Sequence, residues 1–237
     1  MGVRGLFSFF QNSHDNFFVQ KDFQGSLLII DGNNLRYHLY NTCPKRNSCF
    51  GGDYDKYYKH VLTFFENLSL CGITPIVVMD GSFEDAKRQT LWQRLRDQIQ
   101  AGINCTPSNA INVLPLIAKE VFFHSIKEVT TAVLIQDFYE ADSKIALLAS
   151  TLKCPVLSND SDFFVFDVDV ISLRNLTFRS QEKELKHCVL SCQYFDRESF
   201  LKHYGIKNRD LLFLLASLMG NDYVSGKTFE RVFSQIR

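Results

Sequence analysis

The 237-residue sequence has little of what would place a protein in a membrane or outside a cell. Its longest nearly unbroken apolar run, Leu211–Met219, has nine residues, whereas a helix that spans a bilayer needs about 20. The first ten residues lack the features of a secretory signal, and Leu6 stands where a myristoylation signal has Ser or Thr. We therefore expect an intracellular protein without a membrane span.

The sequence also lacks a cysteine framework. Its seven cysteines are odd in number, scattered and without a CxxC spacing, which supports neither a disulfide scaffold nor a zinc ribbon. His187, Cys188 and Cys192 are an incomplete set of metal ligands, and buried thiols on a strand are the preferred interpretation.

An excess of basic charge is missing as well, since 26 basic residues balance 26 acidic residues. A net charge of zero argues against a nucleic-acid-binding protein, because such binding depends on neutralising phosphates. The argument depends on where the acidic residues lie. If seven of them line a metal site, the remaining 19 leave a net charge of about +7 on the rest of the molecule.

Apolar runs alternate with amphipathic segments along most of the chain. Buried parallel strands are predicted at 27–30 (LLII), 76–79 (IVVM), 132–135 (AVLI) and 155–157 (PVL). Helices are predicted at 34–40, 55–70, 83–100, 111–125 and 141–152. This alternation predicts a three-layer α/β fold with a central, mostly parallel sheet and helices on both faces.

The C-terminal part of the chain departs from this alternation. Residues 168–173 and 188–194 are predicted to add two strands, the second at an edge of a sheet that becomes mixed there. Helices follow at 196–204 and 209–219. Loops are expected at 42–52 and 102–109, and the absence of a repeat or a flexible linker favours one domain.

Acidic residues follow the ends of the predicted strands. Asp31 and Asp80 come directly after two of them, and Asp160 and Asp162 come shortly after a third. In an open α/β sheet the ligand crevice lies outside the carboxyl ends of the strands, so these carboxylates should converge. Glu140, Asp142 and Asp222 lie at the ends of predicted helices. Each position taken alone also fits a turn or helix cap.

A group of converging carboxylates needs cations, because the unpaired charges would otherwise repel one another. Oxygen ligands without nearby His or Cys select hard ions such as Mg²⁺ or Mn²⁺. Two such ions about 3.5 to 4 Å apart can activate water and stabilise the leaving oxygen in phosphodiester hydrolysis. The pattern therefore predicts a metal-dependent phosphodiesterase.

Six segments carry a resemblance to a known family: MGVRGL, IIDGNNLRY, VVMDGS, YEAD, LSNDSDFFVF and LMGNDYV, in this order. The chain resembles the flap endonuclease/XPG superfamily, which has a PIN-like fold, and within it looks most like the Asteroid proteins. The resemblance implies a structure-selective DNA endonuclease of DNA repair, located in the nucleus, with two Mg²⁺ ions that Mn²⁺ can replace. The implied metal ligands are Asp31, Asp80, Glu140, Asp142, Asp160, Asp162 and Asp222.

The same resemblance implies residues that contact DNA. Tyr37 matches a tyrosine that stacks on a base beside the scissile phosphate, although a core aromatic is an alternative. Lys87 and Arg94 match a catalytic pair that holds the scissile phosphate, and their spacing places them on one helix face. The alternative for this pair is a solvated helix face. Gly2, Arg4 and Arg88 are further candidates for DNA contact.

Two departures from the family pattern affect what we expect. Asp142 stands where these nucleases usually have Glu. The resemblance places a nuclease domain at 1–224, with parts at 1–100 and 125–224, and then a tail at 225–237 where the family has a duplex-gripping helix-two-turn-helix unit. We therefore expect either a fragment or short form of such a nuclease, or a preference for DNA with single-stranded character, such as single strands or overhangs.

Three other interpretations compete with that of a nuclease: a P-loop protein, a phosphatase and an inactive scaffold. Residues 220–228 (GNDYVSGKT) resemble a P-loop, but the glycine spacing is wrong and the preceding element is a predicted helix. Residues 163–170 (FFVFDVDV) resemble a phosphatase strand, yet Asp167 and Asp169 are better explained as turn residues. The main rival is an inactive scaffold that keeps the nuclease architecture and binds nucleic acid or proteins.

Overall fold

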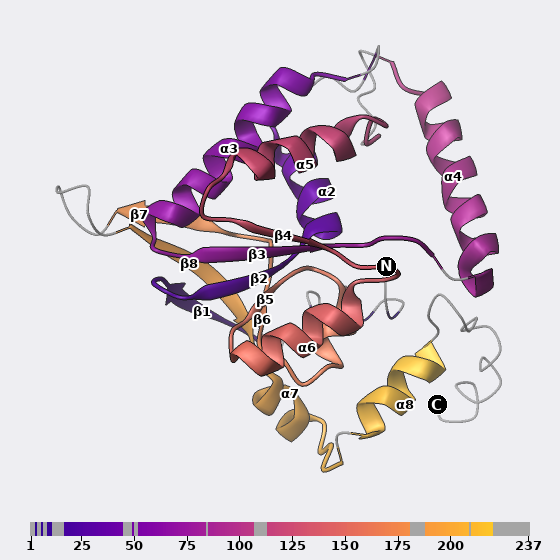
Figure 1. The fold of residues 1–237 in the computed structure, drawn as a ribbon. Coiled ribbons are helices and arrows are strands. Elements are labelled where there is room, and N and C mark those ends of the chain that lie inside the picture. Colours follow the sequence, from indigo (N-terminus) through magenta and orange to yellow (C-terminus); the bar gives the residue numbers. More distant parts are fainter. Residues whose placement is uncertain are drawn as a thin grey trace.

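The computed structural model confirms an α/β protein in which helices cover both faces of a mixed sheet (Figure 1). The structure describes residues 3, 6, 9–10, 17–44, 49, 52–83, 85–106, 113–180, 188–208 and 210–219. The strands are β1 (Phe18–Phe23), β2 (Leu27–Asp31), β3 (Thr74–Met79), β4 (Val133–Gln136), β5 (Val156–Leu157), β6 (Val170–Ile171), β7 (Thr177–Ser180) and β8 (Cys188–Phe195). The α-helices are α2 (Gly32–Thr42), α3 (Tyr54–Leu70), α4 (Arg88–Ile103), α5 (Ala118–Glu128), α6 (Asp142–Leu152), α7 (Arg197–His203) and α8 (Asp210–Met219). Short 3-10 helices are η2 (Asp85–Lys87) and η3 (Ser161–Phe164).

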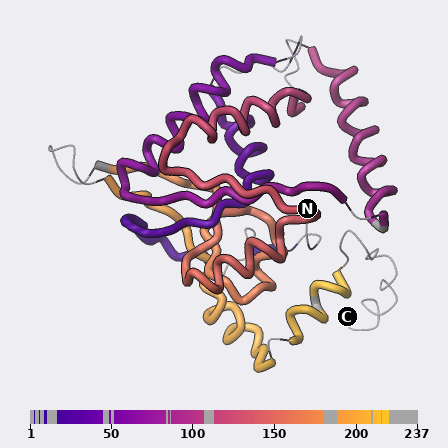
Figure 2. The backbone as a smooth tube through the Cα atoms, viewed as in Figure 1, coloured from indigo at the N-terminus to yellow at the C-terminus, as the bar shows by residue number. Residues whose placement is uncertain are grey.

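The strand order β1-β8-β6-β5-β2-β3-β4 places β2 inside the sheet, between β5 and β3. Strands β6, β5, β2, β3 and β4 are parallel to one another, whereas β8 is antiparallel to β1, β6 and β7. Figure 2 shows the early strands β1 and β2 in the same sheet as the much later β8. The chain moves outward from β2 in both directions, to β3 and to β5. The crevice beyond this reversal of strand order is the expected position of a ligand site.

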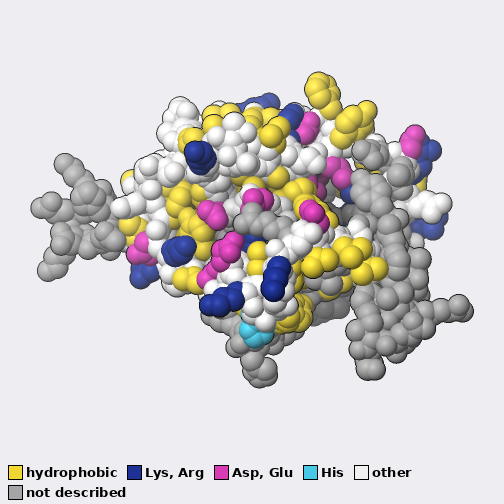
Figure 3. All heavy atoms as spheres, turned by 90° about the horizontal axis from the view of Figure 1, so that it is seen from below, with side chains coloured by type: hydrophobic (Ala, Val, Ile, Leu, Met, Phe, Trp, Pro, Cys, Tyr) yellow, Lys and Arg dark blue, Asp and Glu magenta, His cyan; other side chains and the backbone are white. Residues whose placement is uncertain are grey.

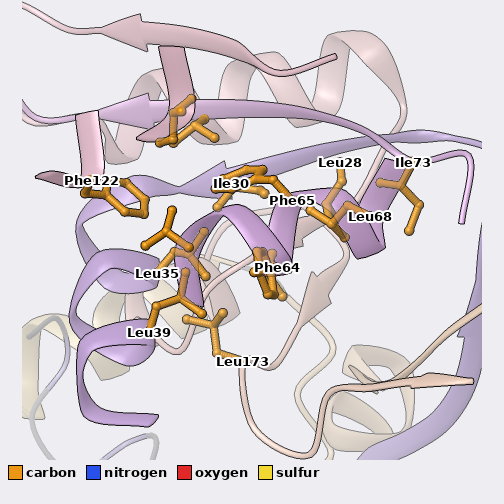
Figure 4. Packing of buried hydrophobic residues seen from close by; sticks show 14 of the residues in the cluster. Leu28, Ile30, Leu35, Leu39, Phe64, Phe65, Leu68, Ile73, Phe122 and Leu173 are labelled. Carbon is orange, nitrogen blue, oxygen red and sulfur yellow. The ribbon is translucent and has the colours of Figure 1, made fainter. Parts of the chain in front are cut away.

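One face of the sheet packs against α2, α3 and α5. Side chains alternate along β2, so that Leu28 and Ile30 face this layer. In Figure 4, Phe65 of α3 lies beside Ile30, and Leu68 lies beside Leu28. Each fully buried side chain of this kind stabilises the fold by about 1.5 to 3 kcal/mol relative to its exposed state.

The opposite face packs against η3, α6, α7 and α8. Ile29 of β2 belongs to this second core, together with Ile145 of α6 and Phe163 of η3. The two cores hold β2 rigidly from both sides. As a result, the backbone of Asp31, at the carboxyl end of β2, is held in place by packing on both faces of the sheet.

Helix α4 differs from the other helices because none of its described side chains is buried. Figure 1 shows it standing apart from the layers, with its first turn near the carboxyl ends of the strands. The sequence predicts a helix from residue 83, but residues 81–83 are irregular and α4 itself begins at Arg88, after η2. The predicted helix at 111–125 also begins later, at Ala118, after the turn that contains Pro115.

The prediction that residues 188–194 form an edge strand is wrong. Strand β8 is internal, because its residues 190, 191 and 194 pair with β1 and also with β7 or β6. β1 has the sequence FVQKDF and is mostly exposed, so it lacks the apolar run that signals a buried strand. Residues 168–173 yield only the two-residue strand β6. Among the described residues, no helix is both long and apolar enough to cross a membrane.

Candidate functional site

A cavity of about 910 Å³ opens at the carboxyl ends of the central strands. Nine residues that the sequence singles out line this cavity: Asp31, Tyr37, Asp80, Lys87, Arg94, Glu140, Asp142, Asp160 and Asp162. They come from segments separated by more than 100 positions in the chain, and only the sheet brings them together. The convergence of strand-end carboxylates expected from the sequence is therefore present in the structure.

Asp31 is the last residue of β2 and the N-cap of α2. Its side chain accepts hydrogen bonds from the backbone N–H of Asn34 at 3.0 Å and from the Ser158 hydroxyl at 2.8 Å. The pKa of Asp31 is nevertheless raised to about 6, first by burial and then by the nearby charges of Asp160 and Asp80, which together outweigh the lowering effect of those bonds. Asp31 thus serves as a helix cap and also belongs to a crowded acidic group.

Asp80 follows β3 and connects the loops after β3 and β4. Its carboxylate accepts a hydrogen bond from the backbone N–H of Ala141 at 2.9 Å, which fixes the chain beside Glu140 and Asp142. Burial raises the pKa of Asp80 above its ordinary value, and the charge of Glu140 adds to this effect.

Asp142 begins α6, where a helix N-terminus ordinarily stabilises a carboxylate. Its pKa is nevertheless raised to about 8, first by burial and then by the charges of Asp160, Asp31, Asp162 and Asp80. Four other carboxylates are therefore close enough to act on Asp142. The shorter Asp side chain, where the family usually has Glu, still reaches this group.

Asp160 and Asp162 are held at the start of η3. Asp160 is the N-cap of this short helix and accepts a hydrogen bond from the backbone N–H of Asp162 at 3.3 Å. The backbone N–H of Asp160 in turn donates to the Ser158 hydroxyl at 2.9 Å. Because Ser158 also donates to Asp31, one serine links the acidic residues of β2 and η3.

The basic residues divide between two faces of η2 and α4. Lys87 and Arg94 line the cavity, as their spacing predicts, and Lys87 is only 8% exposed. Arg88 lies outside the cavity lining and forms an exposed ion pair with Asp85 at 2.5 Å. The structure therefore brings two of the three predicted basic residues of this segment to the site.

Lys87 forms an ion pair with Glu140, with its Nζ 2.5 and 2.6 Å from the two carboxylate oxygens. The sequence gives no sign of this pair, because the two residues are 53 positions apart. The resemblance assigns Glu140 to a metal and Lys87 to a phosphate. In the structure, Lys87 and Glu140 form an ion pair with each other.

Tyr37 lies on α2, is 49% exposed and lines the cavity. The alternative of a core aromatic is therefore wrong for this residue.

Asp167 and Asp169 of the phosphatase-like segment do not belong to the described lining of the cavity, and Asp167 pairs with Arg197 at 2.6 Å. Gly2, Arg4 and Asp222 lie outside the described residues, as do residues 220–228.

Sequence reasoning missed several residues that shape the site. Asn159 holds the loop after β5, since its amide oxygen accepts from the Ser172 hydroxyl and from the backbone N–H of Leu173, both at 2.9 Å. Arg36 and Arg174 also line the cavity, and the charges of Asp80 and Asp31 act on Arg36. Ser158, Asn159 and Arg36 lie within the segments LSNDSDFFVF and IIDGNNLRY, from which the sequence prediction took only the acidic residues and Tyr37.

The donor set fits hard divalent cations. The lining supplies carboxylate oxygens and no thiol, and Asp142 and Asp31 are crowded by like charges that a cation would neutralise. Among the described residues, no group of three or more His, Cys, Asp or Glu side chains is arranged to hold an ion by itself. Mg²⁺ in such sites commonly uses one or two carboxylates together with water and substrate phosphate, so a three-residue cage is not required.

Comparisons with known families agree with this architecture. The XPG N-terminal domain family matches residues 1–101, and the XPG I-region family matches residues 132–222. Together the two regions contain every lining residue discussed above.

Relatives and solved structures show the same pattern. The chain is 32% identical to Protein asteroid of Drosophila melanogaster over 282 residues, covering 99% of this chain and 33% of that protein. It is 39% identical to the single-strand DNA endonuclease ASTE1 of Danio rerio over 233 residues, covering 94% of this chain and 33% of that protein. The chain thus spans about a third of these relatives. The catalytic core of Rad2 in complex with a DNA substrate has a similar fold, with a TM-score of 0.61 at 16% identity, covering 94% of this chain and 63% of that one.

Proposed function

Because this chain belongs to the XPG family, we propose that it is a metal-dependent DNA endonuclease that hydrolyses phosphodiester bonds. The observation that carries the proposal is the convergence of six carboxylates with Lys87, Arg94 and Tyr37 in one cavity. Carboxylates that can hold metal ions and two cationic side chains suit the phosphates of a polynucleotide. An exposed aromatic ring suits its bases.

The acidic residues divide between two proposed Mg²⁺ sites, which Mn²⁺ can also fill. Asp31, Asp80 and Glu140 form the first, and Asp142, Asp160, Asp162 and Asp222 complete the pair. When bound, the ions would supply an activated water and charge stabilisation at the leaving oxygen. Ser158 and the backbone of Ala141 keep Asp31 and Asp80 oriented for this role.

Lys87 and Arg94 act on the substrate phosphate. Both face the cavity, so a phosphate there meets two cations whose attraction increases as negative charge develops in the transition state. Lys87 pairs with Glu140, and a cation held by Glu140 would weaken this pair and leave the Lys87 ammonium available to the phosphate. The ion pair itself neutralises two charges beside the cavity.

We propose a substrate with single-stranded character, in a nuclear DNA repair process. The relative from Danio rerio is named a single-strand DNA endonuclease, and half-exposed Tyr37 offers a stacking surface for an unpaired base. Figure 3 shows the Lys and Arg side chains of the described residues scattered over one face of the molecule.

The variant Asp160→Asn tests the site. We expect its cleavage rate to fall by about 100-fold or more while the fold is kept, because removing one of several like charges relieves repulsion in the metal-free protein. The assay uses end-labelled single-stranded, 5′-flap, 3′-overhang and blunt duplex DNA with Mg²⁺ or Mn²⁺. Asp55→Asn, an exposed position on α3, is the matched control.

The outcomes of this assay separate the candidate functions. Cleavage by Asp160→Asn at the wild-type rate would show that the site assignment is wrong. A strong preference for double-flap junctions would contradict the single-strand proposal. Wild-type protein that binds DNA and never cuts it would favour the inactive scaffold, which the Lys87–Glu140 pair also fits because it occupies two proposed active groups.

A further inference from the structure

Three large aromatic side chains project from the two loops beside the acidic site. Phe83 follows Asp80 by three residues and is 50% exposed. Phe138 and Tyr139 directly precede Glu140 and are 85% and 58% exposed. We call these three residues the aromatic rim. Phe83 also lines the cavity, so the rim adjoins the site.

The backbone holds the rim loops against each other. The N–H of Gly81 donates to the carbonyl of Tyr139, and the N–H of Ser82 donates to the carbonyl of Phe138, both at 2.8 Å. A Cβ atom at Gly81 would lie 2.0 Å from the carbonyl oxygen of Asp137, so only glycine allows this approach. Beyond the ends of β3 and β4, these hydrogen bonds therefore hold the backbones of the two rim loops against each other.

The Asp137 carboxylate braces the same loop. It accepts a hydrogen bond from the backbone N–H of Phe138 at 2.7 Å and pairs with Lys144 of α6 at 3.0 Å. These contacts hold the backbone of Phe138 while its ring stays in solvent. Among the described residues, none of the three rim rings contacts another aromatic ring, in contrast to the many paired rings of the core.

Rigid loops that keep three apolar rings in water beside a catalytic cavity indicate a binding surface. The charges nearby indicate the ligand. A strand whose phosphate lies at Lys87 and Arg94 has its neighbouring bases at the mouth of the cavity, where Phe83 forms part of the wall. Flat rings accept any base by stacking, which requires that the base be unpaired.

We propose that the aromatic rim is a stacking surface for unpaired bases of the DNA strand that enters the cavity. This inference rests on the proposed function and deepens it, because it assigns the selection of single-stranded character to Phe83, Phe138 and Tyr139. The rim binds the substrate and takes no part in the chemistry at the phosphate.

Binding measurements test the rim separately from cleavage. Binding of the protein to a labelled 15-nucleotide oligo-dT, and to a labelled blunt duplex of equal length, is measured by fluorescence anisotropy with Ca²⁺ as the hard cation. We expect the double variant Phe138→Ala, Tyr139→Ala to weaken single-strand binding about tenfold or more, and duplex binding less than threefold. Leu147→Ala, which truncates a 66% exposed apolar residue on α6, is the control and should leave both affinities unchanged.

A second pair of variants distinguishes stacking from general apolar contact. Phe138→Leu keeps an apolar side chain without a ring and should lose affinity, whereas Phe138→Tyr keeps the ring and should bind as wild type. If Phe138→Leu binds oligo-dT as tightly as wild type, the rim is not a stacking surface, and a protein partner becomes the better interpretation.

Failure of this inference is distinguishable from failure of the proposed function. Wild-type protein that cuts DNA, with rim variants that keep their single-strand affinity, overturns the rim alone. Rim variants that lose single-strand affinity in a protein that never cuts DNA support the rim and overturn the nuclease. Equal losses for single-stranded and duplex DNA would also overturn the assignment of specificity to the rim.

Discussion

At the scale of single residues, the contact between the two rim loops depends on the missing side chain of Gly81. In Gly81→Ala the added methyl group would overlap the backbone oxygens of Asp137 and Phe138, which cannot rotate away. We expect a loss of about 1 to 3 kcal/mol, the usual cost of overpacking, and a melting temperature lower by about 2 to 4 °C per kcal/mol.

Gly102→Ala is the matched control for this prediction. Gly102 lies in α4, and a Cβ atom there would meet nothing within 4 Å. Alanine also favours helix over glycine by up to about 1 kcal/mol, so this variant should melt at or above the wild-type temperature. Thermal unfolding followed by circular dichroism compares the two, and an unchanged melting temperature for Gly81→Ala would contradict the close packing.

At the scale of elements, α4 has one face that lines the cavity, yet none of its described side chains is buried. An isolated helix of this length is marginal in water, so α4 should open more readily than α3, which buries five residues in the core. Hydrogen exchange should therefore be faster in α4 by on the order of 100-fold or more.

DNA binding should change this difference. Lys87 and Arg94 lie on the cavity side of η2 and α4, so a bound strand should slow exchange in α4 and leave α3 unaffected. Mass spectrometry with and without oligo-dT measures both effects. Protection of α4 equal to that of α3 in the free protein would show that this helix is stabilised by contacts other than those described.

At the scale of the whole molecule, the fold gathers like charges that oppose its own stability. The pKa values of Asp142 and Asp31 are raised to about 8 and about 6, above the ordinary value of 3.8. Between the ordinary and raised values the folded protein binds more protons than the unfolded chain, so the free energy of unfolding falls as pH rises. Without metal, the protein should therefore melt at a lower temperature at pH 8.5 than at pH 5.5.

Divalent metal should reverse this trend, because it binds the ionised carboxylates of the folded state. Thermal unfolding in EDTA and in Mg²⁺ at both pH values measures the effect, and the gain from Mg²⁺ should be larger at pH 8.5. Asp142→Asn removes the most perturbed carboxylate and should flatten the pH dependence in EDTA. An equally steep fall in this variant would place the cause elsewhere in the molecule.

The sequence by itself determined the alternation of strands and helices from β2 to β5 and the positions of the acidic residues, because both depend on local patterns. Runs such as 27–30 and 76–79 are apolar at every position, and the Asp that follows each marks the end of a strand. Tertiary structure decided the rest. The inner position of β8 depends on the polar strand β1, the Lys87–Glu140 pair joins residues 53 positions apart, and the exposure of the rim depends on Gly81 meeting Asp137. These are long-range pairings, which no local periodicity records, because they arise only when separate segments meet in space.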